Sequence, residues 1–143
     1  MDEREQIIEL IQANEEVFED AFLEKKATDE EITQAEELLG FEIPESYVWF
    51  LKEIGHGGCM FEFMGYGLTG KAIFADETLA QRENGLPNNL MIIQNCDEYF
   101  DCINVEDGSI VTWSQYDKDG VIDKAEDFYS YFLECIEDAI ENY

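Results

Sequence analysis

The stretch TDEEITQAEELLGFEIPESYVWFLKEIGHGG, residues 28–58, marks the ends of two consecutive helices. Thr28, followed three residues later by Glu31, forms a capping box, in which two side chains satisfy backbone N–H groups at a helix start. Gly40 follows an apolar stripe, where helices commonly end in a left-handed residue. Pro44 then suits the first turn of a second helix. We therefore expect helices over residues 28–39 and 44–54.

Helical spacing of apolar residues also precedes this stretch, whereas shorter, strand-like runs follow it. Residues 4–22 carry isoleucines and phenylalanines at helical spacing, with Asn14 as the candidate break. Further on, Asp107-Gly108 between two β-type runs predicts a hairpin turn. The elements expected after residue 58 are strands at 59–64, 90–95, 99–105 and 110–116, a short helix at 74–84 and a closing helix at 125–140.

This order of elements predicts the fold class. Helices followed by hairpin-connected strands are typical of an α+β fold with an antiparallel sheet, not of a doubly wound α/β fold. A chain of 143 residues fits one hydrophobic core. We expect a single domain over residues 1–143, with a mainly antiparallel meander sheet packed with N-terminal helices and a closing C-terminal helix.

The charge of the chain limits its partners. Asp and Glu number 35 against 8 Lys and Arg, giving a formal net charge of -27. The hydrophobic content of 45% is too high for a disordered acidic tail. Such a charge repels nucleic-acid phosphates and anionic membranes, so we expect no direct binding to either. Suitable partners are cationic proteins or metal ions.

The sequence also gives an expectation of location. Its apolar runs are far shorter than the roughly 20 residues that a membrane-spanning helix needs. The first residues are acidic, whereas a secretory signal begins with a basic region and continues with an apolar one. We therefore expect a cytoplasmic protein whose cysteines are reduced.

Histidine and cysteine residues give little support to catalysis or metal binding. His56 and Cys59 are a conceivable zinc pair or catalytic pair, with Cys96 and Cys102 as further ligands. The spacings are wider than those of structural zinc sites, and an anionic environment weakens a thiolate. We expect no enzyme activity, no catalytic residue, no cofactor and no metal site.

A calcium loop is the alternative that the sequence leaves open. With Gly120 at the sixth loop position, Asp117, Asp119, Asp123 and Glu126 fall at positions that bind calcium in EF-hands. The first position is Gln115, where an aspartate is expected, and the preceding element reads as a strand. An acidic turn before the last helix is the favoured interpretation.

The spaced residues of the first block resemble the SUKH superfamily of Smi/Knr-like domains. The block runs from Thr28 through Leu39-Gly40 and Ile43-Pro44 to Gly55-His56-Gly57-Gly58. The later segment DGSIVTW, residues 107–113, and the phenylalanines of the closing helix are similar to that family's later strands and helix. The resemblance extends over nearly the whole chain, although His56 stands where the familiar pattern has asparagine.

The resemblance implies an α+β fold and a binding role. Bacterial members are mostly cytoplasmic immunity proteins that neutralise the toxin domain, often a nuclease, of a polymorphic toxin system. It therefore implies an antitoxin whose partner is a cognate toxin domain, with a basic nuclease as the expected kind. The alternative is a non-enzymatic regulatory scaffold that binds a host protein, as in the yeast cell-wall regulator branch. The sequence leaves the oligomeric state open.

Acids alternating with aromatic residues in the β-side loops make the favoured contact surface. Trp113 is interpreted either as core or as an interface anchor, because aromatic anchors dominate binding energy at interfaces. The acids divide almost evenly between residues 1–54 and 55–143, so the sequence alone does not select a face. The candidate partner-binding residues are Asp97, Glu98, Tyr99, Asp101, Glu106, Asp107, Trp113, Tyr116, Asp117, Asp119 and Asp123.

Overall fold

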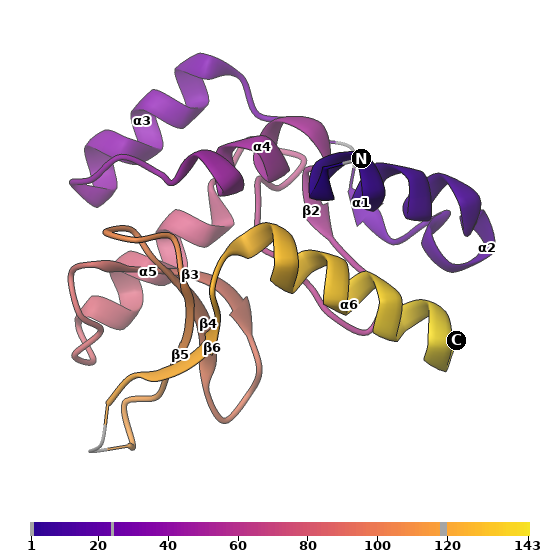
Figure 1. Cartoon of the computed structure of the whole chain (residues 1–143). Helices are drawn as coiled ribbons and strands as arrows, with labels where there is room; N and C mark the ends of the chain where they lie inside the picture. Colours follow the sequence, from indigo (N-terminus) through magenta and orange to yellow (C-terminus); the bar gives the residue numbers. More distant parts are fainter. Residues whose placement is uncertain (1, 24, 118–119) are drawn as a thin grey trace.

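A four-stranded antiparallel sheet in the order β3-β4-β5-β6 organises the second half of the chain (Figure 1). The computed structural model describes residues 2–23, 25–117 and 120–143. The strands are β3 (Leu90–Asn95), β4 (Phe100–Asn104), β5 (Ile110–Trp113) and β6 (Ile122–Ala125), and helix α6 (Phe128–Asn142) follows them. Each strand pairs with the next in sequence, so the predicted meander is confirmed.

The first half of the chain supplies helices and one small sheet. The helices are α1 (Glu3–Ala13), α2 (Glu15–Phe18), α3 (Asp29–Leu39), α4 (Glu45–Glu53) and α5 (Ile73–Arg82), and β1 (Phe22–Leu23) pairs with β2 (His56–Gly57). The capping box at the start of α3 is confirmed, because Thr28 Oγ1 accepts the Glu31 N–H at 3.1 Å and the Glu31 carboxylate accepts the Thr28 N–H at 3.0 Å. The predicted α+β fold class is therefore correct.

The main core joins the helices to one face of the sheet through aromatic rings. Phe50 and Phe63 lie 5.8 Å apart between ring centroids, and both contact Phe128 of α6. Tyr47 is fully buried and satisfies its hydroxyl by donating to the carbonyl of Met64 at 2.5 Å. Burial of these large rings supplies the hydrophobic stabilisation that holds α4 and α6 together.

A smaller apolar cluster lies on the other face of the sheet. Its buried members are Leu86, Leu90, Ile92, Cys102, Val111 and Trp113. Side chains of neighbouring residues alternate between the two faces of a strand. The central strands are therefore apolar on both sides, whereas β6 is mostly exposed.

The two edges of the sheet differ. Three hydrogen bonds close the outer edge of β3: Met64 N–H to the Ile93 carbonyl at 2.8 Å, Glu62 N–H to Gln94 Oε1 at 2.6 Å, and Ile92 N–H to Thr78 Oγ1 at 2.9 Å. At the other edge, β6 forms backbone pairs only with β5 among the described residues. The β5–β6 hairpin projects away from α1 and α2 (Figure 1).

Several predicted boundaries were wrong. Asn14 does end α1, but the first helical region continues only to Phe18, and Phe22 lies in β1. The strand expected at residues 59–64 is reduced to one bridge between Phe63 and Gly57.

The last helix starts later than predicted, because β6 precedes it. Asp127 caps this helix by accepting the Ser130 N–H at 2.8 Å. No helix among the described residues has the length and apolar character needed to cross a membrane.

Candidate functional site

A concavity of about 490 Å³ lies at the free end of the sheet, between the turn before β4 and the β5–β6 loop. We call it the sheet-end groove. It is lined by Glu98, Tyr99, Thr112, Trp113, Ser114, Tyr116, Asp117, Gly120 and Ile122. Tyr116 is 85% exposed and Ile122 is 56% exposed, so the groove presents apolar and phenolic surface to solvent beside two carboxylates. This combination is suited to binding a protein surface.

Local hydrogen bonds position the two walls of the sheet-end groove. On one wall, Asn95 Oδ1 accepts the Asp97 N–H at 2.8 Å, and Asp97 adopts a positive φ of 68°. This tight turn presents Glu98 and Tyr99 at the start of β4. On the other wall, Ser114 Oγ accepts the Tyr116 N–H at 3.2 Å. Short polar side chains that bond the nearby backbone in this way stabilise turns.

Asp101 was predicted to contact a partner, but it is fully buried. Its Oδ1 accepts a hydrogen bond from Lys124 Nζ at 2.9 Å, and its Oδ2 accepts from the Tyr131 hydroxyl at 2.5 Å and from Gln94 Nε2 at 2.8 Å. A buried carboxylate is stable only when it is paired and hydrogen-bonded in this manner. This corrects the prediction: Asp101 joins β4, β6 and α6 beneath the groove.

Lys124 links this buried network to the sheet-end groove. Its Nζ lies 5.3 Å from the centroid of the Tyr99 ring and 5.2 Å from that of Tyr131. Burial opposes the charged form, but the hydrogen bond and charge of Asp101 outweigh it and raise the pKa of Lys124. Burial and the hydrogen bond to Asp101 likewise hold the pKa of Tyr131 far above its usual range. Lys124 therefore stays charged and supports Tyr99 from behind.

Of the two interpretations of Trp113, core residue or interface anchor, the structure supports the first, because Trp113 is buried. Only 5% of it is exposed, and its ring stacks on Phe100 with centroids 6.2 Å apart. It lines the inner wall of the sheet-end groove and belongs to the second apolar cluster. Trp113 therefore supports the shape of the groove without projecting from it.

The remaining candidate partner-binding residues lie in different parts of the structure. Glu98, Tyr99, Tyr116 and Asp117 meet in the sheet-end groove, and exposed Asp97 adjoins them in the turn. Glu106 and Asp107 lie in the β4–β5 turn, which antiparallel pairing puts at the opposite end of the strands. Asp123 lies on β6 opposite Val111, so it is on the face of the second cluster. Asp119 lies outside the described residues.

Sequence reasoning missed the apolar part of the groove. Ile122 lies opposite Thr112 in the ladder, and both line the groove. The signal was present as an apolar pair, Val121-Ile122, directly after the acidic turn. The acidic residues on both sides of this pair favour a turn before the last helix over a strand.

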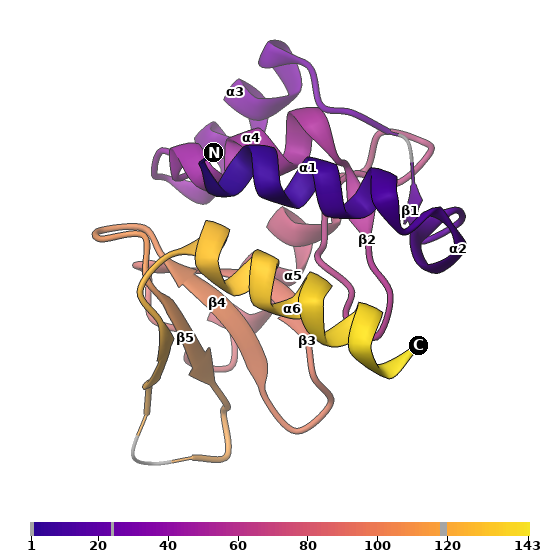
Figure 2. The same ribbon diagram turned by 45° about the vertical axis from the view of Figure 1, so that its right-hand side comes forward.

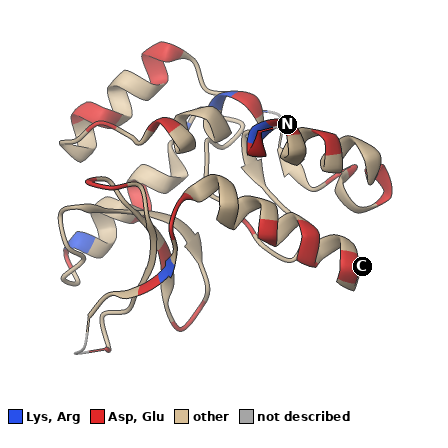
Figure 3. Cartoon of the chain, in the orientation of Figure 1, with Lys and Arg blue, Asp and Glu red and all other residues tan. Residues whose placement is uncertain are grey.

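Folding gathers acids that are far apart in the sequence. Figures 1 and 2 show α1 and α6 side by side, and Ser130 Oγ of α6 donates to a Glu3 carboxylate oxygen of α1 at 2.7 Å. Figure 3 shows the acids along α1, α2 and the second half of α6. Arg4 is the only Lys or Arg in these three helices. The acids are Glu3, Glu5, Glu9, Glu15, Glu16, Glu134, Glu137, Asp138 and Glu141, which we call the acidic helical face.

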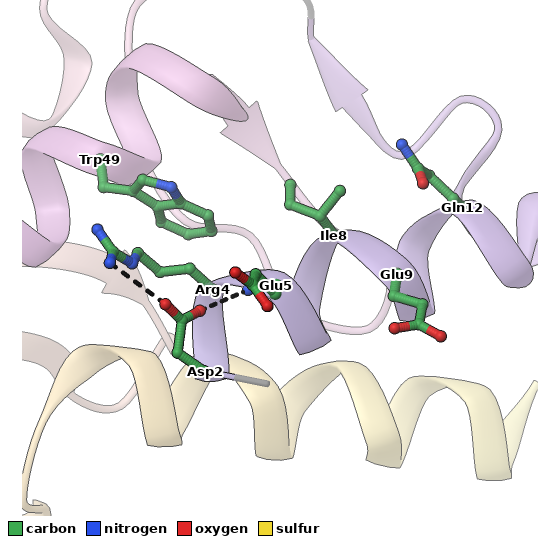
Figure 4. A pocket seen from close by; sticks show the side chains of 7 residues that line it. All are labelled: Asp2, Arg4, Glu5, Ile8, Glu9, Gln12 and Trp49. Atoms are coloured by element: carbon green, nitrogen blue, oxygen red, sulfur yellow. Dashed lines mark hydrogen bonds and ion pairs between the residues drawn. The ribbon is translucent and has the colours of Figure 1, made fainter.

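A second concavity, of about 510 Å³, lies between α1 and α4 (Figure 4). The Trp49 indole lines it, together with the side chains of Ile8 and Arg4. Its charges are partly paired, because Arg4 bonds an Asp2 carboxylate oxygen at 3.3 Å and Asp2 caps α1 by accepting the Glu5 N–H at 2.9 Å. This arrangement accounts for Asp2 and Arg4 as stabilisers of the helix start.

The residues of the metal and thiol alternatives have the following surroundings in the part of the chain that the structure describes. The described residues contain no group of three or more His, Cys, Asp and Glu side chains able to hold a metal ion. The proposed calcium loop is interrupted by β6, which pairs with β5. His56 Nδ1 accepts the Gly65 N–H at 2.9 Å, a structural use of the ring. Burial raises the pKa of Cys135 to about 12 and also raises that of Cys96, which disfavours thiolates.

The fold and this site define an acidic α+β domain with a groove at the free end of a meander sheet. The chain matches the SUKH_5 family, described as SMI1-KNR4 cell-wall, over residues 4–137. It belongs to that family, and the resemblance inferred from the capping box and the later strands is confirmed.

Proposed function

We propose that this protein is an immunity protein, an antitoxin that binds a cognate toxin domain and neutralises it. The observation that carries the proposal is the sheet-end groove, where exposed Tyr116 and Tyr99 lie beside Glu98 and Asp117. Membership of the SUKH_5 family supports it, because the resemblance implies an immunity role for bacterial members. The toxin domain is proposed to be a nuclease with a basic nucleic-acid-binding surface.

The charge explains why a nuclease suits this surface. Nucleases hold phosphates through Lys and Arg, and carboxylates on an inhibitor occupy the same positions. With a net charge of -27, the whole molecule attracts such a surface before contact. The acidic helical face contributes to this long-range attraction, whereas the groove makes the contacts.

Inhibition on this account is occlusion, with no chemical step. Tyrosine side chains give large contact area for little loss of side-chain freedom, which suits them as anchors. The Asp101–Lys124 ion pair fixes β6 against β4 and holds Tyr99 in place, so the groove is ordered before binding. Preorganisation of this kind reduces the entropic cost of association. The protein is proposed to act in the cytoplasm, without cofactor, nucleic acid or membrane as direct partner.

Co-expression tests the proposal. A candidate toxin domain from a neighbouring gene is expressed with and without this protein, and survival and nuclease activity in lysates are measured. We expect the wild-type protein to restore growth and to co-purify with the toxin domain. Growth that is not restored, with no complex, would refute the immunity role and leave regulatory binding to another protein as the alternative.

A further inference from the structure

Among the residues that the structure describes, the outer edge of β6 is the open edge of the main sheet. β6 is the last strand in the order β3-β4-β5-β6, and its four residues are mostly exposed. The opposite edge, at β3, is covered: its Ile93 carbonyl accepts from Met64 N–H, its Ile92 N–H donates to Thr78 Oγ1, and the Gln94 side chain accepts from Glu62 N–H. An open edge presents unsatisfied backbone N–H and C=O groups, which another extended chain can pair with.

Exposed apolar side chains accompany this edge. Val121 is 40% exposed and Ile122 is 56% exposed, and Tyr116 and Tyr99 are exposed beside them. Four of the eight exposed large hydrophobic residues of the described chain are therefore at the sheet-end groove and the start of β6. Ile122 is on the groove side of β6, because it lies opposite Thr112, which lines the groove. A chain added to β6 would extend the groove by one strand.

The charges along β6 determine which kind of extended chain can pair with its outer edge. Asp123 is on β6, the sequence Asp117-Lys118-Asp119 precedes it, and Glu126 and Asp127 follow it, so acids outnumber lysines along this segment. The one Lys of β6, Lys124, points its ammonium inward to Asp101 at 2.9 Å, so it does not offset the acids along the edge. Two copies of this edge would bring like charges together, which opposes self-pairing. An inward-pointing charge is also a device by which edges avoid self-association.

We propose that β6 accepts an extended, Lys- or Arg-bearing segment of the partner protein as a fifth strand of the sheet. The backbone of the segment pairs with the outer edge of β6. Side chains of a strand alternate in direction, so apolar residues of the segment contact Ile122 on the groove side, and basic residues face Asp123 on the other. The inference rests on the proposed function, since the segment belongs to the toxin domain.

Amide hydrogen exchange on the complex tests the strand addition. The probe is the purified candidate toxin domain of the co-expression experiment, carrying a substitution that inactivates the nuclease. We expect outward-facing amides of residues 121–125 to exchange at least tenfold more slowly in the complex than in the free protein. Amides in the β4–β5 turn, at the other end of the sheet, serve as the control and should not change.

Proline substitution gives a second, independent measurement. Ile122→Pro and Asp123→Pro remove neighbouring N–H groups, and neighbouring N–H groups of a strand point to opposite edges. One variant therefore loses a backbone hydrogen bond to β5. The other loses only an N–H group that points away from β5, to the outer edge of β6. The variant that keeps the wild-type thermal unfolding midpoint within a few degrees should bind the toxin domain at least tenfold more weakly. If neither variant folds, the exchange experiment decides.

The outcomes separate this inference from the proposed function. Rescue of growth with unchanged exchange in β6 would overturn strand addition while the immunity role stands. A homodimer with protected β6 amides would also overturn it, because the occupant would then be a second copy. Failure of both rescue and complex formation would refute the immunity role itself.

Discussion

The carboxylate of Asp101 and the ammonium of Lys124 lie 2.9 Å apart and connect β4 to β6 across the intervening strand β5. Asp101 is fully buried, and its second oxygen is held by Tyr131 and Gln94. One ion pair therefore ties the edge strand, the sheet and α6 together below the sheet-end groove. The stability of the groove depends on it.

We expect Asp101→Ala to destabilise the protein by about 3–5 kcal/mol, because the loss of one partner leaves a partly buried ammonium without its counter-ion. Urea denaturation measures the change. Lys52→Met is the matched control, since the Lys52–Asp29 ion pair is exposed and should contribute less than about 1 kcal/mol. Equal effects of the two substitutions would show that the Asp101 network is not structural.

Stability should fall in alkaline solution. The folded protein raises the pKa of Lys124, of Tyr131 and of Cys135, the last to about 12. A group with a raised folded pKa contributes stability below its unfolded pKa and loses it as pH rises through the folded value. The unfolded values are 9.0 for Cys, 10.0 for Tyr and 10.5 for Lys. The free energy of unfolding should therefore decline from about pH 9 to pH 12.

A substitution of Tyr66 gives a more specific test of the predicted loss of stability at alkaline pH. Burial, helped by the negative charge of Glu31, raises the pKa of Tyr66 to about 12, and its hydroxyl donates to the Glu31 carbonyl at 2.9 Å. Tyr66→Phe removes this titration, so the variant should lose less stability than the wild type between pH 10 and 12. Urea midpoints measured across that range test this, and parallel pH curves would contradict it.

Tyr116 should be an anchor of the interface. Tyr116→Ala is expected to weaken toxin binding by at least tenfold, because interface tyrosines commonly contribute about 2 kcal/mol or more when removed. Tyr143→Ala is the matched control, since Tyr143 is similarly exposed but lies after α6, outside the sheet-end groove. The unfolding midpoints of both variants should stay near that of the wild type. Equal affinity of the two variants would place the contact elsewhere.

Salt and the acidic helical face should act on the association rate. Exposed charges separated by more than about 8–10 Å are screened at physiological salt, so the rate constant should fall steeply as ionic strength rises. Replacing Glu134, Glu137 and Glu141 with Gln should slow association and leave dissociation almost unchanged. Stopped-flow mixing and surface-based dissociation measure the two rates. An effect on dissociation alone would mean that this face makes direct contacts.

Local signals predicted much of the fold. The capping box of Thr28 and Glu31 and the left-handed Gly40 are decided by neighbouring residues, and both occur as expected. β6 was missed because its sequence, Ile-Asp-Lys-Ala, has a weak strand pattern and follows an acidic turn. It is a strand because it pairs with β5, which is a tertiary effect.

The site was predicted only in part for a similar reason. Acidic residues near Tyr99 and Tyr116 were recognised, but the burial of Asp101 depends on Lys124, 23 residues later, and on Tyr131 of the last helix. No local pattern carries that information. The acidic helical face likewise arises only when α1 and α6, from opposite ends of the chain, pack side by side.

The affinity of paired charge-neutralising variants for the toxin domain tests the central claim most directly. Glu98→Gln with Asp117→Asn removes two charges in the sheet-end groove, and Glu106→Gln with Asp107→Asn removes two at the opposite end of the strands. Both variants change the net charge equally. Isothermal titration calorimetry should show at least tenfold weaker binding for the first variant and near wild-type binding for the second. Equal affinities for the two variants would contradict the groove as the binding site.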